Sequence, residues 1–341
     1  MKKTFIMAGI SLLLMTSCNN DKDMLNTLNE YNLSKQTQGY HFGDAIQLPK
    51  EVTENAEQIS ISFGDKETND LKVTPDYFTL GDNDVSFIIK TKGGETLTQD
   101  AVINVYAKNP AKKLSFTIEK EYPHDPNNFV QGFQLEGNTI YESDGQNGSS
   151  RMIKYPLGNT KVTEATTQPN EVFSEGATIV GDKVYQLTWQ NKVGFIYNKS
   201  DLKLLETFPY PGILGEGWGL TYDGQYLIAS DGSKNLYFID PKTPSEVVKF
   251  IAVASNDKAY DRLNELEYHN GYVYANVWQQ PIILKINPKN GEVVGIFDFT
   301  ELAKKHTKGQ DDVLNGIAFK GENMLVTGKN WDKIYEVKIS E

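Results

Sequence analysis

Glu175 is the residue of this sequence best suited to acid–base chemistry. It lies between Ser174 and Gly176 at the start of an apolar run, and Trp189 follows fourteen residues later, at the end of the next apolar run. A carboxyl group set against a large aromatic ring is desolvated, which raises its pKa and makes it a usable proton donor or acceptor near neutrality. The stretch 170–189 therefore predicts a site for proton transfer.

The stretch around Glu175 is one of five related segments. Each starts with a polar or aromatic residue, usually followed by glycine, and continues as an apolar strand, a tight turn and a second apolar strand. The first residues are Gln131, Glu175, Trp218, Asn264 and Asn315, which lie 44, 43, 46 and 51 residues apart. A repeat of this length with several short strands is typical of a β-propeller. Five equivalent units argue against the alternative of two stacked sandwiches.

Further apolar runs complete the segments into blades of four strands. Two more strand-like runs follow the second, third and fourth segments, at 193–198 and 203–210, 235–240 and 246–253, and 282–287 and 292–299. Only one run, 333–339, follows the fifth segment, but a surplus strand at 114–120 precedes the first. Pairing of these two strands closes the ring and leaves no blade edge exposed. We predict an all-β fold with a five-bladed β-propeller over residues 112–341, and a short helix at 299–306.

The propeller geometry brings the first residues of the segments together. The first strand of each blade lines the central channel, so these residues converge near one channel mouth. The ends of the second strands add Trp189, Trp278 and Lys329 around this ring. Glu175 is the one acid at a first position, and a lone carboxylate beside indoles suits proton transfer better than glycoside hydrolysis, which generally uses a carboxylate pair. Glu216, Glu265 and Glu267 are near ring positions, so a second channel acid stays open, as does a ring that only holds water.

Composition and motifs argue against several other functions. The net charge is −11 and there is no basic stripe, so we expect no nucleic-acid partner. The four histidines are scattered without paired metal-ligand spacing, and neither a G-x-S-x-G elbow nor a phosphate loop occurs. The oxygen-rich stretches 144–149 and 255–261 match no ordered Ca²⁺ loop. We expect no metal at the site and no cofactor; a structural Ca²⁺ could be held there but is not indicated.

The N-terminus resembles a bacterial lipoprotein signal. Two lysines follow the first methionine, an apolar run extends from Phe5 to Met15, and small residues precede Cys18, the only cysteine of the sequence. The run is short for a membrane-spanning helix, which favours a secretory signal. We predict a lipoprotein-type signal over residues 1–18, lipidation at Cys18, and anchoring in the bacterial cell envelope, in the periplasm or at the outer membrane. An ordinary cleaved signal is the alternative.

Two further segments separate the signal from the propeller. Residues 19–31 are polar and are predicted to form a flexible tether. Short alternating runs between turn signals then predict a small immunoglobulin-like β-sandwich over residues 32–108. We see no clustered catalytic side chains there, which favours a spacer role for this domain.

A recognisable set of short segments recurs across all five repeats. They are FVQGF (129–133), FSEGATIVGDKVYQLTW (173–189), GEGWGLTYDG (215–224), LNELEY (263–268), YANVW (274–278), DVLNGIAF (312–319) and VTGKNW (326–331). These segments resemble the glutaminyl cyclotransferases of the plant and bacterial type. The resemblance covers about Phe116 to the C-terminus and leaves out the signal and the first β domain. It implies a five-bladed propeller that cyclises the N-terminal glutamine of peptides to pyroglutamate, releases ammonia and uses no metal.

The resemblance also implies roles for particular residues. Glu175 matches the family's catalytic glutamate, which would take a proton from the substrate's α-ammonium and then protonate the departing ammonia. The family's substrate-site positions match Gln131, Trp189, Trp218, Asn264, Trp278 and Lys329. Lys329, or the amides of Gln131 and Asn264, could hydrogen-bond the developing oxyanion. The tryptophans would wall the pocket and desolvate the acid.

These inferences predict an envelope-anchored, monomeric glutaminyl-peptide cyclotransferase, an acyltransferase whose partners are peptides or proteins with an N-terminal glutamine. Two alternatives stay open. One is a non-catalytic envelope propeller that binds peptide termini or cell-envelope fragments, and the other is a lactonase-like propeller with a channel Ca²⁺. A desolvated Glu175 further predicts that activity falls on the acid side well above the ordinary carboxyl pKa of roughly 4.3.

Overall fold

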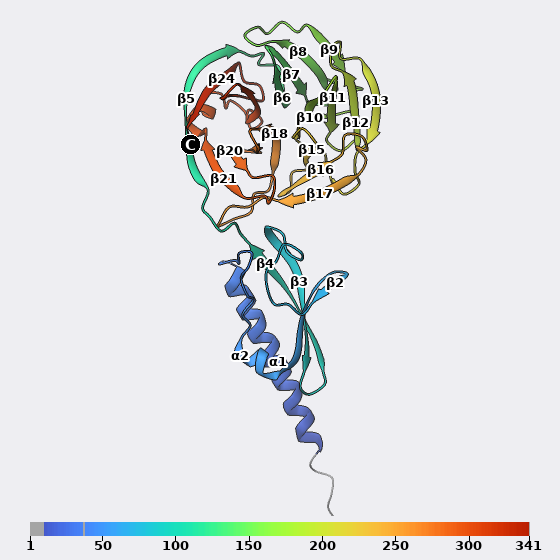
Figure 1. Ribbon diagram of the computed structural model, residues 1–341, viewed down its shortest axis with the longest axis vertical. Coiled ribbons are helices and arrows are strands. Elements are labelled where there is room, and N and C mark those ends of the chain that lie inside the picture. The colour runs from blue at the N-terminus through green and yellow to red at the C-terminus, as the bar shows by residue number, and fades with distance from the viewer. Residues whose placement is uncertain (1–9, 37, 341) are drawn as a thin grey trace, which may run out of the picture. The chain divides into compact units, whose positions relative to one another are not determined.

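The computed structural model describes residues 10–36 and 38–340, and the chain divides into two compact units, residues 1–108 and 109–341 (Figure 1). Every sheet lies within one of these units. The first nine residues of the predicted signal fall outside the described residues, and at Cys18 only the backbone is described. No helix in the described part of the chain is both long and apolar enough to cross a membrane.

The first unit combines one antiparallel sheet with a long helix. Its elements are α1 (Ile10–Gln36), α2 (Lys50–Asn55), β1 (Ala56–Phe63), β2 (Lys66–Thr68), β3 (Gly81–Thr91) and β4 (Thr96–Val105). The strands are ordered β2-β1-β3-β4, and α1 contacts β4. In β3, Val85, Phe87 and Ile89 are buried while the side chains between them are more exposed, so one face of the sheet supplies the core.

Two predictions for this unit are wrong. Residues 19–31 are not a tether, because they lie in α1, where Met24 and Leu28 are one turn apart and buried. The polar composition concealed this helix, although the stretch holds neither glycine nor proline. Residues 32–108 are not a sandwich, because their described strands form a single sheet whose covering layer is helical. Alternation along a strand predicts one-sided burial but does not say what covers the buried face.

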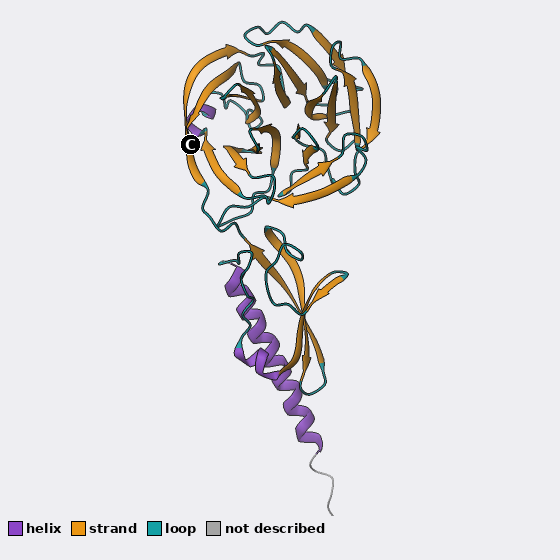
Figure 2. Ribbon diagram, in the orientation of Figure 1, coloured by secondary structure: helices purple, strands orange, loops and turns teal. Residues whose placement is uncertain are grey.

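The second unit is the predicted propeller, with five blades of four strands each (Figures 1 and 2). The first blade is β6 (Val130–Glu136), β7 (Thr139–Asp144), β8 (Arg151–Pro156) and β9 (Glu164–Thr167), and the second is β10 (Ser174–Val180), β11 (Lys183–Thr188), β12 (Val193–Asn198) and β13 (Leu204–Pro209). The third is β14 (Leu220–Tyr222), β15 (Leu227–Ser230), β16 (Asn235–Ile239) and β17 (Val247–Ala252), and the fourth is β18 (Leu263–His269), β19 (Tyr272–Val277), β20 (Gln280–Ile286) and β21 (Val293–Asp298). The short helix α3 (Thr300–Ala303) precedes the fifth blade, which is β22 (Leu314–Lys320), β23 (Asn323–Gly328), β24 (Lys333–Ser340) and β5 (Lys112–Pro123).

The first strand of this unit closes the ring, as the sequence predicted. β5 pairs antiparallel with β24 from Pro123↔Lys333 to Ser115↔Ser340, so it is the outer strand of the fifth blade. It also pairs in parallel with β21, which joins the fourth and fifth blades into one eight-stranded sheet. The fifth blade therefore gains its fourth strand from the start of the unit, and β24 is not left as its edge.

The core lies between neighbouring blades. Ile140 and Ile153 of the first blade pack with Leu325 and Ile334 of the fifth, and the other described clusters join further pairs of blades in the same way. Burial of one such aliphatic side chain stabilises the fold by about 1.5–3 kcal/mol, so each blade is held chiefly by the blades on either side.

The five innermost strands line the central channel and contact one another in a closed circle, β6-β10-β14-β18-β22-β6. Glycine in these strands permits the close approach. A Cβ at Gly176 would overlap the backbone of the next blade at Leu220, and one at Gly219 would overlap the backbone of Asn264. The glycine that recurs after the first residue of most segments is thus a packing requirement of the channel wall.

Candidate active site

The structure gathers all seven predicted site residues around one pocket. The pocket has a volume of about 340 Å³ and is lined by Gln131, Glu175, Trp189, Trp218, Asn264, Trp278 and Lys329, together with Phe129, Gln146, Phe173 and Asp311. Their elements come from all five blades: Gln131, Glu175 and Asn264 lie in β6, β10 and β18, Trp218 comes just before β14, and Lys329 follows β23. Asn315 in β22 completes the predicted ring but does not line the pocket.

A shift in strand pairing aims the ring residues at the channel mouth. In the second blade, Ser174 pairs with Thr188 and Ala177 with Gln186, so Glu175 and Gly176 together oppose a single residue. The same extra residue occurs at the ring positions of the first, fourth and fifth blades. Such bulges bend a strand and redirect its side chains, which explains why these four blades each place a polar ring residue in the same location.

Glu175 is buried, and its carboxylate has one hydrogen-bond donor among the described residues. Gln131 Nε2 donates to Glu175 Oε1 over 3.0 Å. Asn315 Nδ2 donates to Gln131 Oε1 over 3.3 Å and to the backbone oxygen of Val130 over 2.8 Å, which fixes the orientation of the Gln131 amide. Burial raises the pKa of Glu175 well above its ordinary value, the charge of Lys329 opposes this, and the charge of Glu216 adds to it. The site therefore holds a carboxyl group whose proton is exchangeable closer to neutrality.

Lys329 is the cation of the pocket. It is only 5% exposed, and its Nζ lies 4.6 Å from the centre of the Phe129 ring. Burial lowers its pKa to about 8, although Glu175 and Asp311 act in the opposite direction. The pocket thus contains an acid with a raised pKa and a base with a lowered pKa, a combination that concentrates at catalytic sites.

The aromatic walls are ordered by contacts with one another and with Glu216. Trp218 and Trp278 meet edge to face with ring centres 5.8 Å apart, and Trp189 packs against Phe173. Glu216 accepts hydrogen bonds from Trp189 Nε1 at 2.6 Å and from Trp218 Nε1 at 2.9 Å. Although partial burial opposes it, these bonds and one from Gln190 lower the pKa of Glu216, so it stays ionised and holds both indoles in place.

Asn264 lines the pocket and carries a buried acceptor. Its side chain is buried, and its Oδ1 has no hydrogen-bond partner among the described residues. A buried acceptor without a partner is costly, so this residue is a place where the structure gives up stability beside the pocket. Among the described residues, no three His, Cys, Asp or Glu side chains are grouped so that they could hold a metal ion.

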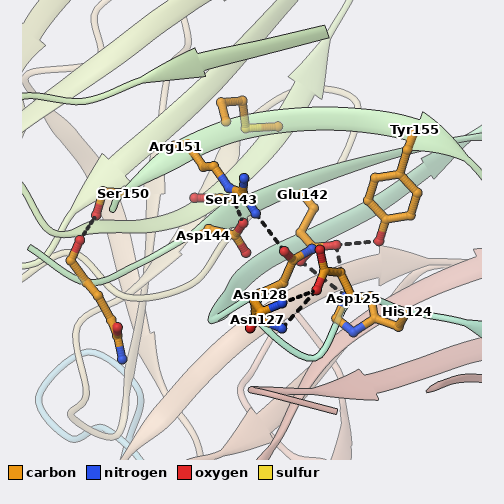
Figure 3. A network of polar contacts seen from close by, with 12 residues as sticks. His124, Asp125, Asn127, Asn128, Glu142, Ser143, Asp144, Ser150, Arg151 and Tyr155 are labelled. Atoms are coloured by element: carbon orange, nitrogen blue, oxygen red, sulfur yellow. Dashed lines mark hydrogen bonds and ion pairs between the residues drawn. The ribbon is translucent and has the colours of Figure 1, made fainter. Parts of the chain in front are cut away.

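The turn that carries Lys329 is held by residues from the start of the propeller. His124 Nδ1 lies 2.7 Å from the oxygen of Trp331, and Asn330 N donates to the backbone oxygen of Asn128. His124 Nε2 is 3.1 Å from the buried Glu142 (Figure 3), and although burial opposes it, that carboxylate raises the pKa of His124. This buried ion pair therefore fixes one end of the wall on which Lys329 lies.

Sequence reasoning missed several residues of the pocket. Phe129 and Phe173 each stand two places before a ring residue, Gln131 and Glu175, so this shared offset could have identified them. Gln146 and Asp311 lie in loops outside the repeat and carried no such signal. The link from Glu216 to two tryptophans depends on the packing of the second and third blades and has no counterpart in the spacing of the sequence.

Comparison with known proteins agrees with this geometry. A family model described as glutamine cyclotransferase matches residues 91–339. A glutaminyl-peptide cyclotransferase of Arabidopsis thaliana is 39% identical over 230 residues, which is 66% of this chain and 71% of that protein. The crystal structure of the Myxococcus xanthus glutaminyl cyclase superposes with a TM-score of 0.62 at 31% identity, and the match covers 67% of this chain and 98% of that one.

Proposed function

This chain belongs to the glutamine cyclotransferase family, and we propose that it cyclises the N-terminal glutamine of peptides to pyroglutamate with Glu175 as its acid–base group. Glutaminyl-peptide cyclotransfer is the activity to which the family, the relative and the structural neighbour all point. The observation that carries the role of Glu175 is its position, because it is a buried carboxyl group in the pocket with a raised pKa and a hydrogen bond from the Gln131 amide.

The reaction needs one group that moves a proton twice. The substrate's α-nitrogen attacks the carbon of its own side-chain amide, and as the new C–N bond forms the nitrogen loses a proton to the Glu175 carboxylate. Glu175 then gives that proton to the amide nitrogen, the old C–N bond breaks, and ammonia leaves. The carboxylate is regenerated, so Glu175 returns to its starting state after each turnover.

The other pocket residues hold and polarise the substrate. The Lys329 ammonium is the strongest donor in the pocket and would stabilise the negative charge that develops on the amide oxygen. Trp189, Trp218 and Trp278 surround the substrate stem and hold it in the conformation that cyclises. No step requires a metal, and addition of a chelator should leave the rate unchanged.

Ammonia release tests this function directly. We expect the purified chain to release ammonia from a glutaminyl dipeptide and to leave an asparaginyl dipeptide unchanged, since the latter cannot form the five-membered lactam. The rate should fall as pH drops through the raised pKa of Glu175, because the carboxylate that accepts the proton exists only above that pKa. Absence of release from every glutaminyl peptide would favour the binding role, and a profile flat down to about pH 4.5 would contradict the burial of Glu175.

We also propose that the mature chain begins at Cys18 and is lipid-anchored in the cell envelope. The basic residues, apolar run and small residues before this cysteine support the proposal. In bacteria that express the gene, the protein should fractionate with membranes, and mass spectrometry should find acyl groups on its first residue. Cys18→Ala should move it to the soluble fraction. If the wild type and Cys18→Ala partition equally between the membrane and soluble fractions, the proposed lipid anchor is wrong.

A further inference from the structure

A second cavity lies beside the active-site pocket. Its volume is about 320 Å³, and its walls include Gln279, Thr300, Ala303 and Gln310. At two places its wall continues that of the active-site pocket, because Gln279 follows Trp278 in the chain and Gln310 precedes Asp311. Consecutive Cα atoms are about 3.8 Å apart, so the walls of the two cavities are one residue apart at these points.

The outer wall of this cavity is the part of the propeller that departs from the repeat. The spacing of 51 residues before the fifth segment is the longest of the four, and the excess forms α3 and the loop that follows it, with α3 drawn as the short purple helix of the ring in Figure 2. Insertions in repeat proteins commonly build the binding face. This one supplies Thr300, Ala303, Thr307 and Gln310 to the second cavity and Asp311 to the pocket.

Hydrogen bonds hold the inserted loop against the turn that carries Lys329. Asp312 Oδ2 accepts from the backbone nitrogens of Lys308 and Gly309, at 3.0 and 2.6 Å. Its Oδ1 accepts from Asn330 Nδ2 at 2.8 Å, and Asn330 is the neighbour of Lys329. The loop is therefore a fixed wall and not a loose flap, and it is attached to the turn that carries the pocket's cation.

The lining suits an uncharged segment of peptide. Amide and hydroxyl groups from Gln279, Thr300 and Gln310 can pair with peptide N–H and C=O groups, and Ala303 and Val313 give an apolar floor. Lys304 is the charged residue among those that line the cavity, and its Nζ is paired with Glu301 at 2.6 Å. The cavity lining therefore carries one charge, which has a carboxylate beside it, and is otherwise uncharged.

We propose that this cavity is a subsite for the residues that follow the N-terminal glutamine and that it selects an uncharged, apolar side chain. The inference rests on the proposed function. When the N-terminal glutamine of a peptide occupies the active-site pocket, the residues that follow it must leave the pocket along its lining. One extended residue spans about 3.3–3.6 Å, so the second or third residue reaches a cavity whose wall begins beside Trp278 and Asp311.

A matched pair of tryptophan variants tests the subsite. Thr300 lines the cavity, whereas Lys305, an exposed residue in the turn that follows α3, does not line it. The measured quantity is the ratio of kcat/KM for Gln-Phe-Ala to kcat/KM for glutaminamide, which has no following residue. Thr300→Trp should lower this ratio about tenfold, the loss expected when an apolar group is denied its pocket, and Lys305→Trp should leave it at the wild-type value. The wild type should also prefer Gln-Phe-Ala to Gln-Asp-Ala.

The outcomes separate the subsite from the function. If both substrates release ammonia but the ratio is unchanged in Thr300→Trp, or falls equally in Lys305→Trp, the subsite is wrong and the function stands. If neither substrate releases ammonia in the wild type, the proposed function itself fails. Should Thr300→Trp not fold, Thr307→Trp fills the cavity from the neighbouring turn and is judged by the same ratio.

Discussion

Exchange of Glu175 for glutamine is expected to lower kcat for ammonia release by about 10²–10⁴-fold, the usual contribution of a positioned acid–base group. Glutamine has the shape of the neutral acid and can still accept the bond from Gln131, so the pocket should keep its form. What is lost is the ability to accept and return a proton. KM should change far less than kcat, because the walls that hold the substrate remain. Steady-state kinetics with a glutaminyl dipeptide measure both.

Glu267 provides the matched control for this exchange. It is another buried glutamate of the channel whose pKa is raised by burial, but it does not line the pocket. Burial raises the pKa of Glu267 and so favours its neutral form, which glutamine matches in shape, and kcat of Glu267→Gln should stay close to that of the wild type. Comparable losses in both variants would mean that any buried channel carboxyl matters, and Glu175 would lose its particular role.

Exchange of Lys329 for methionine is expected to lower kcat by about 10²–10³-fold, the effect of removing one donor to a developing oxyanion. Methionine fills a similar volume and keeps the apolar contact with Phe129, so the loss reports the ammonium group. Since the positive charge of Lys329 lowers the pKa of Glu175, its removal should also move the acid limb of the pH profile upward. An unchanged acid limb would show that the two groups do not interact.

Arginine at position 329 separates charge from shape in this second test. The pKa of Lys329 is about 8, so the wild-type rate should fall as pH rises through that value and the ammonium is lost. Arginine keeps its charge to above roughly pH 12, so Lys329→Arg should recover part of the rate and remove the alkaline limb. A limb that persists near the same pH in this variant would assign it to another group.

The propeller could be predicted because the same pattern of strands and turns recurs in all five blades. The count of strands was enough to pair 114–120 with 333–339, and the structure confirms that closure. Residues 19–31 and 32–108 had no repeat to check against. There the sequence predicted individual strands, but the covering helix followed from tertiary packing, which local composition does not record.

The site residues that could be predicted are likewise those that occupy repeated positions. Gln131, Glu175, Trp218 and Asn264 could be placed because they occupy one position of the repeat, and repeated positions converge in a ring. Glu216 and Asp311 could not, because their contacts join loops that the repeat does not specify. Nor does spacing predict which way the Gln131 amide points, since that depends on Asn315 from the far end of the chain.

The closure of the ring also sets when the enzyme becomes active. Tyr122 and Glu336 are hydrogen-bonded although 214 positions separate them, and His124 contacts the turn beside Lys329 from nearly as far along the chain. Contacts between such distant positions form late, because a long loop must lose conformational entropy before the contacts can stabilise the fold. During synthesis the first strand must therefore wait for the last one to emerge. Until β5 pairs with β24, the blade that carries Lys329 lacks its outer strand. A partly synthesised or truncated chain therefore has an incomplete fifth blade beside the active-site pocket.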